Sequence, residues 1–186
     1  MQTPEEPNSG DTGVALFIDH YNILDGCDNV GIPGYNYDVL AEVASKAGQM
    51  VFGRVYLVTD GTSGGKLYKF FELGIEPVYT PQYRAGDEDK SKSLADPMMV
   101  CDIMQTLYER PFIKTFVIVS GDKDFIPVTR KISEHGKQAI IIGVERSTAQ
   151  ALTTECARLN FKFLTYETLH RDFKRSHPKN EQVIIP

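Results

Sequence analysis

Leu16-Phe17-Ile18-Asp19-His20-Tyr21-Asn22 is the segment that decides the fold, because a carboxylate there ends an apolar, β-branched run. The run Val14–Ile18 is typical of a buried strand, so Asp19 should lie at its carboxyl end rather than on a solvated face. A second acidic segment, Ser120–Phe125 with the sequence S-G-D-K-D-F, follows the strand predicted at Phe116–Val119 in the same way. If these strand ends converge, they form an oxygen-rich pocket suited to Mg²⁺ or Mn²⁺.

Outward from these segments, the chain alternates short β-branched runs with longer runs of helical period. This alternation predicts an α/β fold: a single Rossmann-like domain whose mostly parallel sheet carries helices on both faces. Ligands of such sheets bind outside the carboxyl ends of the strands, where both acidic segments would lie. Strands are predicted at Val14–Ile18, Val51–Val58, Glu76–Tyr79, Phe116–Val119, Gln138–Ile142 and Phe161–Leu164, and helices at Tyr37–Ala47, Gly65–Leu73, Ala95–Tyr108, Phe125–Glu134, Ala149–Ala157 and Thr165–Phe173.

The length of 186 residues suits one domain, since domains commonly run to roughly 100–200 residues. We expect a disordered leader at residues 1–13, which are polar and acidic, then the domain at 14–173 and a tail at 174–186. The polar stretch from Tyr83 to Ser93 lacks periodicity and predicts a mobile loop at the rim of the pocket.

Composition excludes several classes of protein. The chain is 41% apolar and 24% charged, and no apolar stretch approaches the ~20 residues of a membrane helix, so we expect no membrane partner. Three widely spaced cysteines without CxxC argue against a zinc knuckle or a disulfide framework and favour a reducing, cytoplasmic setting. The net charge of −5 argues against an indiscriminate nucleic-acid binder. It does not exclude a nuclease, because a bound divalent cation inverts the field of its carboxylates.

The helix predicted at Ala95–Tyr108 supplies a third acid. An apolar stripe at helical spacing includes Asp96 at its first turn, so this carboxylate should point toward the sheet. The residues of the stripe are Asp96, Met99, Val100, Ile103 and Leu107. Capping is the open alternative, because Asp before Pro97 is a common N-cap pair. Asp102 lies about 120° from the centre of the stripe at ~100° per residue, which favours a solvated position.

Each of the other acids also has a plainer alternative. Asp19 could open an Asx-turn, and Asp122 or Asp124 could cap the following helix. In the functional interpretation, the carboxylates bind a hard cation, and the Asn22 amide orients a water or a phosphate oxygen. Gly121 would permit a sharp turn there.

Other catalytic chemistries find less support. The four histidines show no HxxxH or HxH spacing for a zinc hydrolase, and Ser120 lacks a G-x-S-x-G context. Gly61–Gly65 is a weak phosphate-loop signal without the GK[ST] ending.

Taken together, Phe17–Asn22, Lys92–Asp96 with Asp102, and Val119–Pro127 resemble the NYN domain, a branch of the PIN-like nuclease superfamily. The stretches Gly136–Gly143 and Ser147–Phe163 resemble its later half, and S-G-D-x-D-F-x-P is the most specific block. Here Lys92 stands one residue further from Asp96 than in the family's usual K-x-x-D. The resemblance implies a Rossmann-like sheet, divalent metal held by Asp19, Asp96, Asp122 and Asp124, and RNA cleavage.

The sequence thus predicts a Mg²⁺- or Mn²⁺-dependent endoribonuclease. Its catalytic residues would be Asp19, Asn22, Asp96, Asp122 and Asp124, with Lys92 and Ser120 contacting RNA. The main alternative is a non-catalytic regulatory or RNA-binding module that keeps the same fold. A haloacid-dehalogenase-like phosphatase is a weaker rival, because it requires D-x-D directly after the first strand. The sequence leaves open a homo-oligomer or a protein partner.

Overall fold

The computed structural model describes residues 12–58, 64–84 and 91–178. The predicted leader and the end of the predicted tail therefore lie largely outside the described residues. The elements in chain order are β1 (Gly13–Asp19), α1 (His20–Asn29), α2 (Tyr37–Ala47), β2 (Gln49–Leu57), α3 (Gly64–Glu72), β3 (Ile75–Tyr79), β4 (Gln82–Arg84), β5 (Ser91–Ser93), α4 (Ala95–Glu109), β6 (Ile113–Val119), a 3₁₀ turn η1 (Lys123–Phe125), α5 (Ile126–Glu134), β7 (Gln138–Gly143), α6 (Gln150–Arg158), β8 (Lys162–Thr165) and α7 (Tyr166–Ser176).

A six-stranded parallel sheet forms the centre of the molecule, with the strand order β3-β2-β1-β6-β7-β8. From β1 the chain moves outward to β3 on one side and then crosses to β6, which pairs with the other side of β1. The carboxyl ends of β1 and β6 therefore form the point where the strand order reverses. Ligands of open α/β sheets bind at this point.

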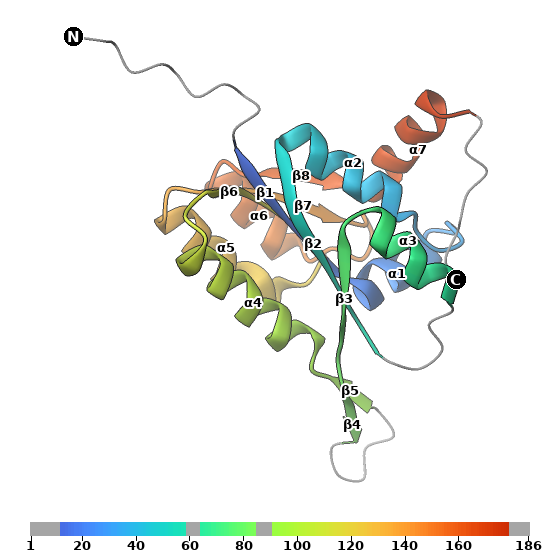
Figure 1. The fold of residues 1–186 in the computed structure, drawn as a ribbon, viewed down its shortest axis with the longest axis horizontal. Helices are drawn as coiled ribbons and strands as arrows, with labels where there is room; N and C mark the ends of the chain where they lie inside the picture. Colours follow the sequence, from blue (N-terminus) through green and yellow to red (C-terminus); the bar gives the residue numbers. More distant parts are fainter. Residues whose placement is uncertain (1–11, 59–63, 85–90, 179–186) are drawn as a thin grey trace.

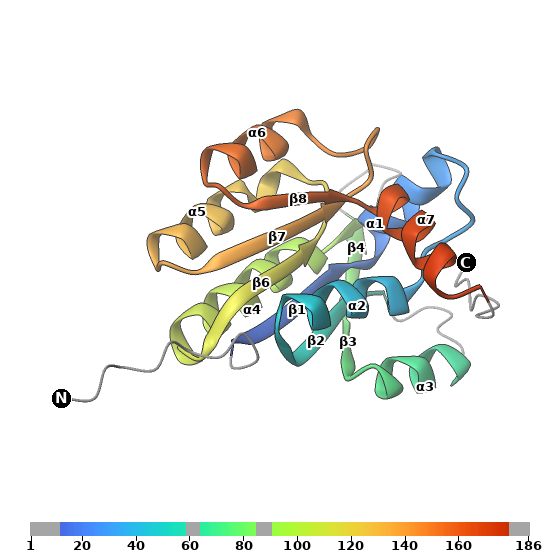
Figure 2. The same ribbon diagram turned by 90° about the horizontal axis from the view of Figure 1, so that it is seen from above.

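Helices cover both faces of the sheet, as Figures 1 and 2 show. An apolar core lies between the sheet and the helices on each face. Leu16 and Ile18 of β1 face a core that includes residues of α1, α2, α3 and α7, while Ala15 and Phe17 face a core formed with α4, α5 and α6. All seven residues of β1 are buried, as is typical of a central parallel strand covered on both faces. The predicted α/β class and single domain are confirmed.

Two features differ from the sequence prediction. The helix α1 was not predicted, since its ten residues are mostly polar and only Ile23, Gly26 and Cys27 are buried. The loop predicted from Tyr83 to Ser93 contains a short antiparallel hairpin, β4–β5, which projects from the sheet just before α4 (Figure 1). Residues 85–90 of that loop lie outside the described residues.

The longest described helix is α4, with 15 residues. Within the ranges that the structure describes, no helix has both the length and the apolar character to cross a membrane.

Candidate functional site

Asp19 lies at the carboxyl end of β1, where only 5% of its surface is exposed. Its Oδ1 accepts a hydrogen bond from the backbone N–H of Asn22 at 3.3 Å and thereby caps α1. Its Oδ2 accepts a hydrogen bond from the Ser120 hydroxyl at 3.2 Å, at the end of β6. The Asx-type contact expected as an alternative is thus present. It opens a helix rather than a loop, and it leaves the carboxyl group facing β6.

Asp96, in the first turn of α4, contacts Asp19 at this edge of the sheet. The two side chains share a hydrogen bond, and Asp96 is half-buried. The N-cap of α4 is Leu94, which makes no side-chain capping bond, so the proposed Asp-Pro cap is wrong. Met99, Ile103 and Leu107 are buried as the stripe predicted, and this packing holds Asp96 toward the sheet.

The contact between these two acids changes their proton affinity. Burial, together with the charge of Asp96, raises the pKa of Asp19 from 3.8 to about 7. The pKa of Asp96 is raised as well, first by burial and then by the charge of Asp122, while the hydrogen bond from Asp19 opposes that rise and the charge of Asp124 adds to it. Without a cation, the pair therefore keeps a proton on Asp19 up to near-neutral pH.

The loop after β6 carries the other two acids. The backbone N–H of Asp122 donates to the Ser120 hydroxyl at 3.2 Å, and Asp122 Oδ1 accepts from the backbone N–H of Asp124 at 2.9 Å. Asp122 thus caps the 3₁₀ turn, as its capping alternative predicted. Asp122 is half-buried and Asp124 is exposed. Because both charges raise the pKa of Asp96, and Asp96 in turn raises that of Asp19, Asp96 lies within electrostatic reach of each of the other three acids.

Asn22 and Gly121 join the two strand ends. The backbone N–H of Gly121 donates to Asn22 Oδ1 at 2.7 Å. The amide oxygen of Asn22 therefore holds the loop after β6. Gly121 was predicted to supply a sharp turn, but it is not among the described glycines with positive φ. A Cβ at Gly121 would instead lie 2.9 Å from the Cα of Thr148. Glycine is needed here because the loop before α6 passes so close.

Ser120 is a positioning residue in this geometry. Only 1% of its surface is exposed, and its hydroxyl links the Asp19 carboxyl group to the Asp122 backbone. The RNA contact predicted for Ser120 stays a prediction. Lys92 lies in β5, but its side chain falls outside the described part, as does most of the Gly61–Gly65 loop.

Asp102 does not lie on a solvated face. Its Oδ2 accepts a hydrogen bond from the Tyr56 hydroxyl at 2.6 Å and forms an ion pair with Arg54 at 2.9 Å. The side chain is 25% exposed, and both partners come from β2. Asp102 therefore fastens α4 to the sheet instead of joining the four acids.

Sequence reasoning missed an aromatic network beside the site. His20, the first residue of α1, has its Nδ1 2.7 Å from the Tyr35 hydroxyl and 3.1 Å from the Tyr37 hydroxyl, and Tyr35 donates to Tyr37 at 2.8 Å. Tyr35 is 1% exposed, and its pKa is raised first by burial, then by its neighbour Tyr37, and further by the charge of Asp19. These contacts fix the entry of α1. No local pattern signals the contacts of His20, because its partners lie 15 and 17 positions away in the chain.

A metal site requires several donor side chains arranged around one point. Among the described residues, no three His, Cys, Asp or Glu side chains are already arranged to hold one. The chemistry of the set nevertheless fits Mg²⁺ or Mn²⁺, because oxygen ligands are what these cations prefer. The buried Asp19 and the half-buried Asp96 form an acid pair beside two further carboxylates. None of the four makes an ion pair with a lysine or arginine within the described ranges. Two residues, Asp19 and Asp96, are in direct contact.

Comparison with known proteins places this arrangement in a family. Residues 13–163 match the NYN domain model, from the first strand to the last. The chain belongs to the NYN domain family. NYN domains form a branch of the PIN-like nuclease superfamily, whose members generally use a divalent metal, and NYN domains generally bind RNA. The match leaves no support for the haloacid-dehalogenase-like alternative.

Two further proteins are similar to this chain. An uncharacterised protein of Methanocaldococcus jannaschii is 34% identical over 143 residues, which are 77% of this chain and 52% of that protein. The chain thus spans about half the length of its archaeal relative. The crystal structure of a protein of unknown function from Vibrio parahaemolyticus superposes with a TM-score of 0.70 at 20% identity, over 89% of this chain and 96% of that one. At that identity the similarity concerns the fold alone.

Proposed function

We propose that this NYN domain is a metal-dependent endoribonuclease that hydrolyses RNA phosphodiester bonds at Asp19, Asp96, Asp122 and Asp124. The observation that carries the proposal is the contact of the buried Asp19 with the half-buried Asp96 at the reversal point of the sheet. A carboxyl pair with a raised pKa is costly to bury, so such pairs cluster where charge is used in binding or catalysis.

The four acids would hold a Mg²⁺ or Mn²⁺ ion. Once bound, this ion would neutralise charge on the phosphate oxygens and lower the pKa of water at the site. Asp19 must lose its proton for the pair to become a ligand set, so metal binding should release protons near neutral pH. Metal would therefore replace the shared proton.

The chain's own contacts would prepare the site for RNA. Ser120 holds the Asp19 carboxyl group, and Asn22 holds the loop that carries Asp122. The exposed Asp124 would accept a proton from the water molecule that attacks phosphorus. As phosphorus bonds to the incoming oxygen, the bond to the leaving ribose oxygen breaks.

Single-stranded or loop RNA is the substrate class that we propose. A splayed backbone reaches a site at the strand ends more easily than a stiff duplex does. The net charge of −5 implies few phosphate contacts, so activity should depend strongly on salt unless a partner or a second copy adds positive charge. A cytoplasmic setting remains part of this proposal.

The test is cleavage of end-labelled single-stranded and hairpin RNA in Mn²⁺, Mg²⁺ or chelator. We expect metal-dependent cleavage by the wild type and none by Asp19→Asn or Asp122→Asn, while Lys92→Ala loses only part of the rate. Asp25→Asn is the matched control, because it removes one exposed charge from α1. Activity that survives in Asp122→Asn would indicate a contaminating ribonuclease.

The second candidate is a non-catalytic RNA-binding or regulatory module. The observation that favours it is that no described group of three acids is arranged to hold metal. Binding of the same RNAs without cleavage in any metal would support this module and contradict the nuclease.

A further inference from the structure

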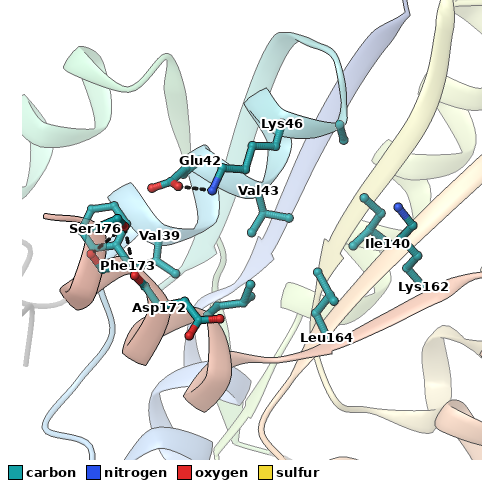
Figure 3. A pocket seen from close by; sticks show the side chains of 12 residues that line it. Val39, Glu42, Val43, Lys46, Ile140, Lys162, Leu164, Asp172, Phe173 and Ser176 are labelled. Atoms are coloured by element: carbon teal, nitrogen blue, oxygen red, sulfur yellow. Dashed lines mark hydrogen bonds and ion pairs between the residues drawn. The ribbon is translucent and has the colours of Figure 1, made fainter. Parts of the chain in front are cut away.

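A cavity of about 500 Å³ opens between α2, α7 and the strands β7 and β8 (Figure 3). Its apolar wall includes Val39 and Val43 of α2, Ile140 and Leu164 of the sheet, and Phe173 of α7. None of the four site aspartates lines it. Cavities that bury a drug-sized ligand measure roughly 300–1,000 Å³, so this one can take several apolar side chains.

The arrangement of the helices explains the cavity. On this face α2 packs on β1 and β2, whereas α7 packs on β8. The two helices meet beyond the sheet, and the strip of β7 and β8 between them forms the floor of the cavity. Figure 3 shows Ile140 and Leu164 on this floor, opposite Val43. Apolar surface of this kind is normally covered in a folded protein.

The chain leaves α7 at the mouth of the same cavity. His177, which follows the last residue of α7, stacks on Phe173 with ring centroids 4.3 Å apart. Its Nδ1 also lies 3.9 Å from the Glu42 carboxylate of α2. Phe173 and Glu42 both line the cavity. The stacking fixes His177 on the last turn of α7, and the approach to Glu42 places the end of α7 beside α2, at the opening.

We propose that the segment Val183-Ile184-Ile185 fills this cavity in the same molecule. These three residues are adjacent, apolar and β-branched, and they follow a polar stretch, Lys179–Gln182. They lie outside the described residues. Left in water, three adjacent apolar side chains would cost free energy that burial in the cavity recovers.

The length of the connection allows this docking. From Ser176, which lines the cavity, to Val183 is 183 − 176 = 7 residues, and an extended chain spans at most ~3.3–3.6 Å per residue. The reach is therefore roughly 23–25 Å. The part of α7 that lines the cavity, Leu169 to Ser176, rises only ~1.5 Å per residue, or about 10 Å. The segment can thus return along the whole of this wall.

Charge on the rim also suits this occupant. Glu42 and Asp172 bring negative charge to the lining, and Lys46 and Lys162 bring positive charge. The connecting stretch carries one residue of each sign, Lys179 and Glu181. The cavity rim and the connecting stretch each carry both signs of charge. They can therefore lie against each other without the repulsion between two surfaces of like charge.

Tryptophan fluorescence tests the proposal, because the chain contains no tryptophan. In the full chain, Ile184→Trp should emit at shorter wavelength than Asn180→Trp, the control in the polar stretch. Adding Val43→Lys, which places a charge in the cavity wall, should return the Ile184→Trp emission to the wavelength of the control. Emission from Ile184→Trp that matches the control in the wild-type background would overturn the proposal, provided that circular dichroism shows both variants folded.

Two further measurements distinguish the protein's own C-terminal segment from a second copy of the chain as the occupant of the cavity. An emission shift that is unchanged on dilution supports docking within one molecule, whereas a shift that vanishes on dilution while light scattering shows a dimer would mean that a second copy fills the cavity. Deleting residues 182–186 should lower the melting temperature by about 2–4 °C. An unchanged melting temperature after the deletion would contradict the proposal.

Discussion

Asn22 Oδ1 accepts a 2.7 Å hydrogen bond from the backbone N–H of Gly121, which ties the first helix to the loop after β6. This bond joins the two strand ends at which the sheet order reverses. It holds Asp122, which follows Gly121, at a fixed place relative to Asp19. The geometry of the site thus depends on the hydrogen bond that the Asn22 amide makes with the loop.

Asn22→Ala should destabilise the protein by about 1–3 kcal/mol, because the buried N–H of Gly121 loses its acceptor. Asn29→Ala, at an exposed position near the end of the same helix, should change the stability by less than about 0.5 kcal/mol. Urea unfolding of both variants measures the difference. Equal stabilities would show that the loop does not depend on this bond.

The contribution of Asp19 to the stability of the metal-free protein should fall as pH rises from about 4 to 7. Its pKa is near 3.8 when unperturbed and about 7 in the folded protein, so the folded state binds more protons in that window. The contribution is fully present below the unfolded pKa and is lost as pH rises through the folded pKa. Each unit of pKa shift is worth ~1.4 kcal/mol.

Asp19→Asn isolates this effect, since its amide can donate to Asp96 at every pH. The free energy of unfolding of the wild type minus that of the variant should decline by a few kcal/mol between pH 4.5 and 8 in chelator. Asp25→Asn should show no such decline. A difference that is flat with pH would show that the pKa of Asp19 is not raised.

Asp122→Asn should melt higher than the wild type in chelator, by roughly 2–4 °C for each kcal/mol of repulsion relieved. Asparagine can keep the capping bond to the Asp124 N–H, so the change removes charge alone. Mg²⁺ or Mn²⁺ should raise the melting temperature of the wild type and affect the variant less. If the variant melts no higher and metal shifts neither protein, the acids are not coupled.

Asp102→Asn should cost about 1–2 kcal/mol of stability and leave the cleavage rate per folded molecule unchanged. The variant leaves Arg54 without its closest carboxylate, but Asn can still accept from Tyr56. Both side chains of the ion pair are about a quarter exposed, which keeps the cost modest. Thermal melts and the RNA assay give the two readouts. A lost rate with unchanged stability would place Asp102 in the active site.

The sequence alone determined where Asp19, Asp96 and Asp122 stand along their elements. Apolar runs fix strand ends locally, and the period of an amphipathic helix fixes which of its residues face the sheet. The helix at Tyr37–Ala47 was predicted with its observed bounds, and Asp96 was placed correctly in the inward stripe. These features depend only on neighbours in the chain.

Only the tertiary structure decided what those residues touch. The hydrogen bond from Ser120 to Asp19 joins residues 101 positions apart, and the hydrogen bond from Tyr56 to Asp102 joins residues 46 positions apart. The raised pKa of Asp19 likewise arises from burial and from Asp96, neither of which a local pattern encodes. Periodicity specifies the face on which a side chain lies, whereas its partner depends on how the elements cross and pack.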